Sequence, residues 1–103
     1  ARTHNTTKDG GSWSDDTIQK VWSKGQMITG YSSQIWRWDK CGDVMKFSEH
    51  GNRNSKQGWE IDHIIPVALG GDDNLTNLQP LNWSNNASKS DKKIGNVLKN
   101  KHI

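Results

Sequence analysis

The chain has 103 residues, the length of a single domain, and leaves little room for a second one. Only 30% of the residues are hydrophobic while six are tryptophan, so a small core has to be built from a few large side chains. A single cysteine excludes an intrachain disulfide framework and a four-cysteine zinc site. The net charge of +3 is compatible with a polyanionic partner but does not demonstrate one.

No apolar run approaches the roughly 18 residues of a membrane span, and no secretory-signal pattern is visible. We therefore expect no membrane association and a cytoplasmic location, with secretion or a phage origin as open alternatives. The polar residues 1–12 predict a loosely ordered N-terminal arm.

A short helix is expected after this arm. Ser14 is a good N-cap, two acidic residues follow it in the first turn, and Gly25 is a natural stop. One face carries an apolar stripe of Ile18, Val21 and Trp22. Because the stripe is narrow and no reactive cluster accompanies it, we expect this helix to be scaffolding.

The middle and end of the chain alternate turn-rich and apolar segments. Residues 26–43 are expected to be irregular, followed by a short strand near 44–47. Further extended segments are expected within the apolar stretch 59–69 and at 78–81. The polar residues that follow have capping chemistry for a helix running to about Lys89.

The chemistry-bearing residues lie between 59 and 91. Asp62 and His63 are neighbours in an otherwise apolar strand, where a carboxylate and an imidazole are costly unless paired or metal-bound. The structural alternative is that Asp62 caps a loop and His63 is a satisfied, half-buried histidine. Further hydrogen-bonding or charged groups follow at Asn77, Asn86 and Lys89. This strand, loop, strand, helix context favours a functional site.

These residues resemble the HNH endonucleases, whose active site is a ββα-metal motif made of a β-hairpin and a helix. The matching positions are Asp62-His63, Pro66, Gly70-Gly71, Asn77-Leu78-Gln79-Pro80-Leu81, Asn86 and Lys89. They correspond to the family variant in which asparagine replaces the final histidine. The resemblance extends over about residues 21–92. It implies one α+β domain over 13–103, with a small ββα-metal core at about 59–91, an N-terminal helix and flanking short elements.

The resemblance also implies a role for each matching residue. His63 would be the general base that deprotonates the attacking water. Asp62 and Asn86 would bind one divalent cation, and Asn77 would staple the loop and orient His63. Because both ligands offer oxygen, Mg²⁺ or Mn²⁺ is expected in preference to Zn²⁺.

The chain departs from the family at the zinc knuckle that many relatives carry. The corresponding positions are Trp38, Cys41, Asn82 and Asn85, so three of the four cysteine ligands are missing. We expect no structural zinc. The hypothesis is that tryptophan packing takes its place, with these candidates: Trp36, Trp38, Trp59 and Trp83.

Several basic residues are candidates for phosphate contacts in the nucleic acid. They are Lys89, Lys92, Lys93, Arg37 and Arg53. Lys89 is the strongest candidate because it lies one helical turn from Asn86. The alternatives are a solvated lysine-rich tail and, for Arg37, a structural ion pair with Asp39 or Asp43. His4, His50 and His102 have no supporting pattern and are expected to be surface residues.

The function expected from this resemblance is hydrolysis of DNA phosphodiester bonds. The chain holds no base-reading module, so we expect weak sequence preference on double-stranded DNA, with RNA cleavage left open. A single site would nick one strand at a time, in a monomer or weak dimer. Two alternatives remain: a catalytically silent nucleic-acid-binding module on the same fold, and a toxin-type nuclease held by an immunity protein.

Overall fold

The computed structural model describes residues 2–89, which fold into two short helices and two small antiparallel sheets. The helices are α1 (Asp15–Trp22) and α2 (Trp83–Lys89). The strands are β1 (Gln26–Met27), β2 (Trp36–Trp38), β3 (Val44–Lys46), β4 (Trp59–His63) and β5 (Leu78–Asn82). This confirms the predicted α+β class. Within the described residues, no helix is long and apolar enough to cross a membrane.

Helix α1 begins where the capping pattern predicts. The hydroxyl of Ser14 accepts a hydrogen bond of 3.1 Å from the backbone amide of Thr17, which satisfies one of the unpaired donors of the first turn. The helix ends at Trp22, before Gly25, and its last two residues, Val21 and Trp22, are buried. The helix therefore contributes to the core, as its apolar stripe predicts.

Strands β1, β2 and β3 form a three-stranded antiparallel sheet, which the sequence does not predict. Residues 26–43 were expected to be irregular, but β1 and β2 both lie within them. Each has only two or three residues. Such strands are too short to show the alternation from which strands are recognised in a sequence.

Strands β4 and β5 form the second sheet, a hairpin in which Asp62 lies opposite Gln79 and Ile61 opposite Pro80. The backbone amide of Ile61 points away from β5 and donates to the side-chain oxygen of Asn5 at 2.8 Å. Pro80, which has no N–H to donate, therefore occupies a pair that needs no hydrogen bond between the strands.

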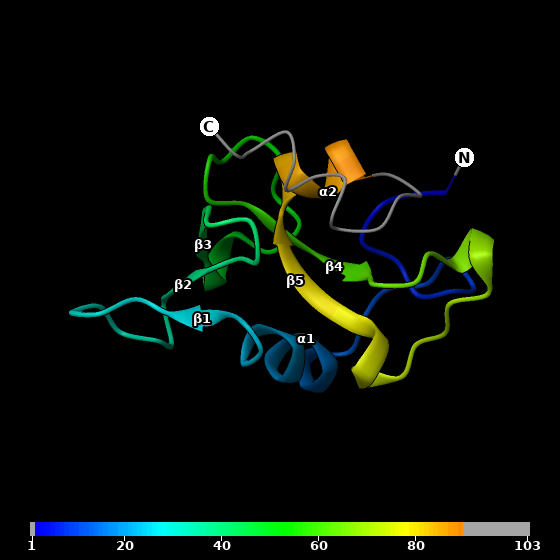
Figure 1. Ribbon diagram of the computed structural model, residues 1–103, viewed down its shortest axis with the longest axis horizontal. Helices are drawn as coiled ribbons and strands as arrows, with labels where there is room; N and C mark the ends of the chain where they lie inside the picture. Colours follow the sequence, from blue (N-terminus) through cyan, green and yellow to red (C-terminus); the bar gives the residue numbers. More distant parts are fainter. Residues whose placement is uncertain (1, 90–103) are drawn as a thin grey trace.

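The two helices lie on opposite sides of the hairpin, with α1 against β5 and α2 across both strands (Figure 1). The core on the α1 side is centred on Trp59, whose ring lies 5.1 Å from that of Trp22 and 6.2 Å from that of Phe47. Because successive side chains of β4 point to opposite faces of the sheet, Glu60 and Asp62 point away from the Trp59 side and toward α2. One strand thus separates a hydrophobic core from a buried polar layer.

A buried carboxylate joins the loop after β2 to the start of α2. Asp39, only 2% exposed, accepts hydrogen bonds through one oxygen from the backbone amides of Cys41 and Asp43. Its other oxygen accepts from the backbone of Asn82 at 2.9 Å and from the side chain of Asn85 at 2.7 Å.

This contact adds a polar link to the tryptophan packing that the hypothesis puts in place of the zinc knuckle. Trp59 is central to the core, and the rings of Trp36 and Trp83 lie near the cations of Lys46 and Arg53. The indole of Trp83 also donates to the carbonyl of Ser55 at 2.8 Å. The start of α2 is linked to the loop after β2 by hydrogen bonds from Asn82 and Asn85 to Asp39 and from Asn85 to Asp43.

Candidate active site

A pocket of about 140 Å³ opens at the end of β4, where the strand, the following loop, α2 and the N-terminal arm meet. Its lining includes Asp62 and His63 from β4 and Asn86 from α2. Neighbouring side chains on a strand point to opposite faces, but β4 ends at His63, so the pocket can be reached from both faces. The structure thus brings three of the predicted site residues to one pocket.

The Asp62 carboxylate is buried and held from two sides. Gln79, its cross-strand neighbour, donates to one oxygen at 2.9 Å. The ammonium of Lys89 lies 3.2 Å from the other oxygen. Burial raises the pKa of Asp62 above its ordinary value, while the hydrogen bond from Gln79 and the charge of Lys89 act in the opposite direction.

Lys89 does not occupy the solvent-facing position expected of a phosphate-binding residue. Its side chain is completely buried, and its ammonium also donates to the backbone carbonyl of His63 at 3.0 Å. The last turn of α2 directs this side chain inward, onto the end of β4. The structure therefore makes Lys89 the partner of Asp62, which corrects its expected place on the protein surface.

Glu60 is a second buried carboxylate on the α2 side of β4, and it is not among the predicted site residues. The amide of Asn86 donates to it at 2.8 Å, and Arg53 binds it with two hydrogen bonds of 2.8 Å. Burial raises the pKa of Glu60, but these bonds and the charge of Arg53 outweigh it, so the pKa is lowered overall. Glu60 holds Asn86 at the pocket. Its position two residues before Asp62, on the same strand face, was the available signal.

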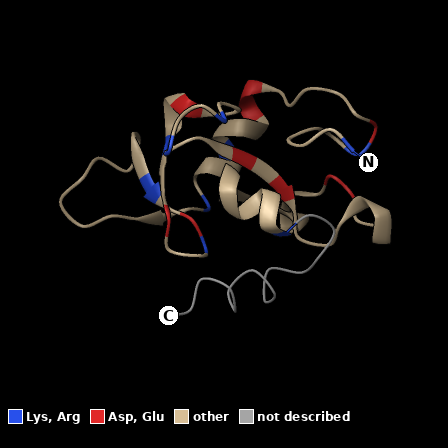
Figure 2. Ribbon diagram, turned by 90° about the horizontal axis from the view of Figure 1, so that it is seen from above, with Lys and Arg blue, Asp and Glu red and all other residues tan. Residues whose placement is uncertain are grey.

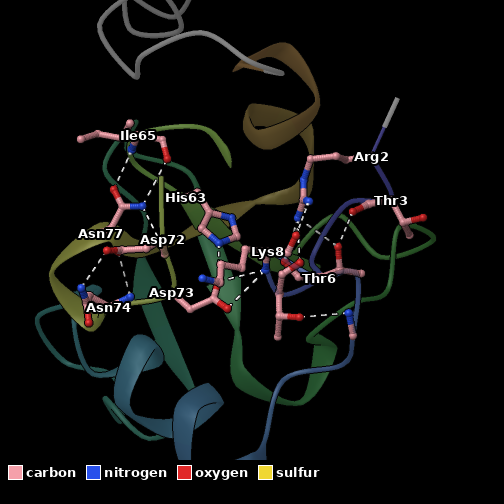
Figure 3. Close-up of polar contacts among 12 residues, drawn as sticks. Arg2, Thr3, Thr6, Lys8, His63, Ile65, Asp72, Asp73, Asn74 and Asn77 are labelled. Atoms are coloured by element: carbon pink, nitrogen blue, oxygen red, sulfur yellow. Dashed lines mark hydrogen bonds and ion pairs between the residues drawn. The ribbon is translucent and has the colours of Figure 1, made fainter. Parts of the chain in front are cut away.

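His63 is held by a carboxylate from the loop between the strands (Figure 3). Its Nε2 lies 2.7 Å from Oδ1 of Asp73, and its ring packs 5.7 Å from that of Trp13. Asp73 in turn accepts hydrogen bonds from the backbone amide of Lys8 in the N-terminal arm. Asp73 was also missed, because nothing in the sequence pairs it with a histidine ten residues earlier.

Asn77 fastens the same loop to the end of β4. Its side-chain oxygen accepts from the amide of Ile65 at 2.8 Å, and its amide group donates to the carbonyls of Ile65 and Asp72. Gly71 allows this close approach, because a Cβ there would lie 1.7 Å from the carbonyl oxygen of Ile65. Asn77 therefore determines the course of the loop that carries Asp73, while Asp73 makes the contact with His63.

The two predicted phosphate-binding arginines do not line the pocket. The guanidinium of Arg37 donates to the carbonyls of Ser33, Ser23 and Gly25, in place of the ion pair considered for it. The guanidinium of Arg53 is occupied by Glu60. Lys92 and Lys93 lie outside the described residues.

Two of the histidines expected at the surface have identifiable roles in the structure: one lines the pocket and the other contacts Trp59 and Asn5. His4 is exposed but lines the pocket. His50 is half-buried, with its ring 4.8 Å from Trp59 and its Nε2 3.1 Å from Asn5. The arm is thus attached to the body of the domain, whereas its polar composition predicts loose order.

The pocket residues fit a hard divalent cation with few protein ligands. Asp62 and Asn86 both line the pocket and both carry oxygen donors. Within residues 2–89, no group of three or more His, Cys, Asp or Glu side chains is arranged to hold a metal. A cation bound here would complete its coordination with water and substrate oxygens, the arrangement that Mg²⁺ favours.

Comparison with known proteins agrees with this geometry. The family model for HNH endonuclease matches residues 40–92, which include both strands of the hairpin and α2. No curated protein and no solved structure matches the chain. Because the match covers half of the sequence and contains all the residues predicted for catalysis and metal binding, the chain belongs to the HNH endonuclease family, which indicates nuclease activity in general.

Proposed function

We propose that this protein is a divalent-metal-dependent DNA endonuclease that hydrolyses phosphodiester bonds with a water activated by His63. The observation that carries the proposal is the presence of Asp62, His63 and Asn86 in the lining of one pocket. A general base and two oxygen ligands for a cation are the groups that hydrolysis of a phosphodiester requires. The substrate is double-stranded DNA, and RNA is a second substrate to be tested.

The contact with Asp73 supports different tasks for the two nitrogens of His63 in this proposal. Because an ionised carboxylate only accepts hydrogen bonds, Nε2 carries the hydrogen that binds Asp73. Nδ1 of the neutral ring then has the lone pair that takes a proton from the attacking water. Asp73 is a positioning residue, since it acts through His63 and also stabilises the imidazolium that forms.

The remaining residues organise the cation site. Asp62 and Asn86 would hold Mg²⁺ or Mn²⁺, which supplies charge stabilisation at the phosphate and at the leaving 3′ oxygen when bound. Gln79 and Lys89 fix the Asp62 carboxylate, and Glu60 fixes the Asn86 side chain. Each proposed ligand is therefore positioned by another side chain before a metal arrives.

The cleavage is expected to be nicking with weak sequence preference. One active site cuts one strand per encounter, and no base-reading element is present among residues 2–89. Contacts to the phosphate backbone position a protein on DNA without reading its sequence.

The decisive experiment compares the wild type with His63→Ala on supercoiled plasmid in EDTA, Mg²⁺, Mn²⁺ or Zn²⁺. The wild type is expected to produce nicked circles with Mg²⁺ or Mn²⁺ and none in EDTA. His63→Ala is expected to bind the plasmid but nick it about 10²–10⁴-fold more slowly, the range of general-base effects. Circular dichroism of both proteins controls for folding.

Two outcomes would contradict the proposal. If both proteins shift the plasmid in a gel and neither nicks it, the domain is a binding module that has lost catalysis. If Zn²⁺ supports faster nicking than Mg²⁺ and Mn²⁺, the assignment of a hard cation to Asp62 and Asn86 is wrong. A parallel assay on single-stranded RNA tests whether the 2′-hydroxyl is tolerated.

A further inference from the structure

Of the five cations expected to bind phosphate, Lys92 and Lys93 lie outside the described residues, and the other three have protein partners. Lys89 is buried against Asp62, Arg53 is bound by Glu60, and Arg37 is held by three backbone carbonyls. The charges along the ribbon are drawn in Figure 2. A nuclease pocket that contains a carboxylate still needs a positive group to attract the phosphate backbone.

The N-terminal arm, residues 2–9, forms one wall of the pocket. Residues 2–6 line it opposite Asp62, His63 and Asn86. The arm is attached at two points: Asn5 accepts from the backbone of β4 at 2.8 Å, and the amide of Lys8 donates to Asp73 at 3.0 Å. Since Asp73 also binds His63, the arm and the proposed general base share one anchoring residue.

Arg2 brings a guanidinium to this wall. It donates to the carbonyl of Thr7 at 2.8 Å and to that of Lys8 at 3.1 Å, which curls the arm around it (Figure 3). These acceptors are neutral, so the positive charge is not cancelled, and Arg2 has no ion pair with an acid within residues 2–89. Among the described residues that line the pocket, Arg2 alone carries a permanent positive charge.

We propose that the N-terminal arm is part of the active site and that Arg2 binds a backbone phosphate of the nucleic acid at the pocket. The inference rests on the proposed function, because the ligand is the phosphodiester backbone of the same substrate. A guanidinium already oriented by backbone carbonyls loses less conformational entropy when it binds phosphate.

The test measures binding of a short double-stranded DNA across a series of salt concentrations, in a His63→Ala background in EDTA. Arg2→Ala is expected to weaken binding about 10-fold and to reduce the slope of log K against log salt by about 1. Lys56→Ala is the matched control, because it removes one exposed positive charge that does not line the pocket. Its effect on affinity and slope is expected to be much smaller.

Arg2→Lys separates phosphate binding from a purely structural role in the arm. Lysine keeps the charge but cannot reproduce the two-pronged contact with the arm carbonyls. If Arg2 binds phosphate, Arg2→Lys retains the wild-type salt slope. If it loses as much slope and affinity as Arg2→Ala, Arg2 acts by shaping the arm and the phosphate contact is wrong.

The two proposals fail in different ways. Wild-type protein that nicks plasmid, together with Arg2→Ala that binds as well as Lys56→Ala, overturns the arm proposal and leaves the endonuclease intact. Wild-type protein that neither nicks nor binds DNA overturns both.

Discussion

The side-chain amide of Asn85 donates a hydrogen bond of 2.7 Å to the carboxylate of Asp39, 46 residues earlier in the chain. Asn82 binds the same carboxylate through its backbone amide. Both asparagines are among the positions at which the resemblance to zinc-knuckle relatives predicts cysteine ligands. Because Asp39 also accepts from the backbone amides of Cys41 and Asp43 in its own loop, one buried carboxylate joins this loop to the start of α2.

Replacing Asp39 with alanine should destabilise the whole domain. The change leaves three backbone amides without their acceptor and removes one of the two carboxylates that the Asn85 side chain binds, the other being Asp43. The expected loss is about 3 kcal/mol in the free energy of unfolding. Urea denaturation monitored by tryptophan fluorescence measures the loss. The exposed Asp9→Ala is the control, and equal effects of the two changes would show that the Asp39 contacts are not structural.

Asp73→Asn should slow catalysis without weakening DNA binding. Asparagine removes the charge that stabilises the His63 imidazolium, and the loss of a charged hydrogen bond corresponds to about a 10–100-fold decrease in kcat. Single-turnover nicking at saturating protein gives the rate, and a gel shift in EDTA gives the affinity. Asp72→Asn is the neighbouring control, since Asp72 binds Asn74 and not His63. Equal slowing by both variants would mean that only the loop conformation matters.

Lys89→Met should affect stability more than nucleic-acid binding. Methionine keeps much of the side-chain volume but leaves the buried Asp62 without its cation, at a cost of about 3 kcal/mol in the free energy of unfolding. The salt slope of DNA binding should remain that of the wild type, because Lys89 is buried. A slope reduced by about 1 in a folded Lys89→Met protein would restore Lys89 as a phosphate contact.

His50 should make the fold less stable in mild acid. Burial lowers its pKa below the ordinary value of 6.5, with a smaller opposing effect from the charge of Glu60. The unfolded chain therefore binds a proton more readily than the folded one, and stability falls as the pH drops below 6.5. Thermal unfolding between about pH 5.5 and 8 measures this decline. His50→Gln should flatten it, and the exposed His4→Gln should not.

The local signals in the sequence were sufficient for the two helices and the extended segments, whereas the hairpin and the α+β class were implied by the resemblance to the HNH endonucleases. The cap of Ser14 and the apolar run beginning at Trp59 depend on near neighbours, which a sequence shows directly. The buried pairs could not be found in this way. Glu60 and Asn86 are 26 residues apart, and only the packing of α2 on β4 brings them together.

Lys89 illustrates why exposure is harder to predict than secondary structure. The sequence predicts that a lysine at the end of a short polar helix faces solvent. No pattern in the sequence indicates in which direction the side chains of the last turn point. Its direction depends on the carbonyl of His63 and the carboxylate of Asp62, both supplied by another element. The same reasoning applies to the arm, whose order depends on partners more than 50 residues away.

The attachment of Asn5 to β4 also affects how the molecule meets other copies of itself. The edge of β4 that faces away from β5 would otherwise present unpaired backbone groups, a template for strand addition and aggregation. The amide of Ile61 is instead taken by Asn5, and the carbonyl of Trp59 by the amide of Gly51. The arm that lines the pocket thereby also shields the strand edge on which the pocket is built.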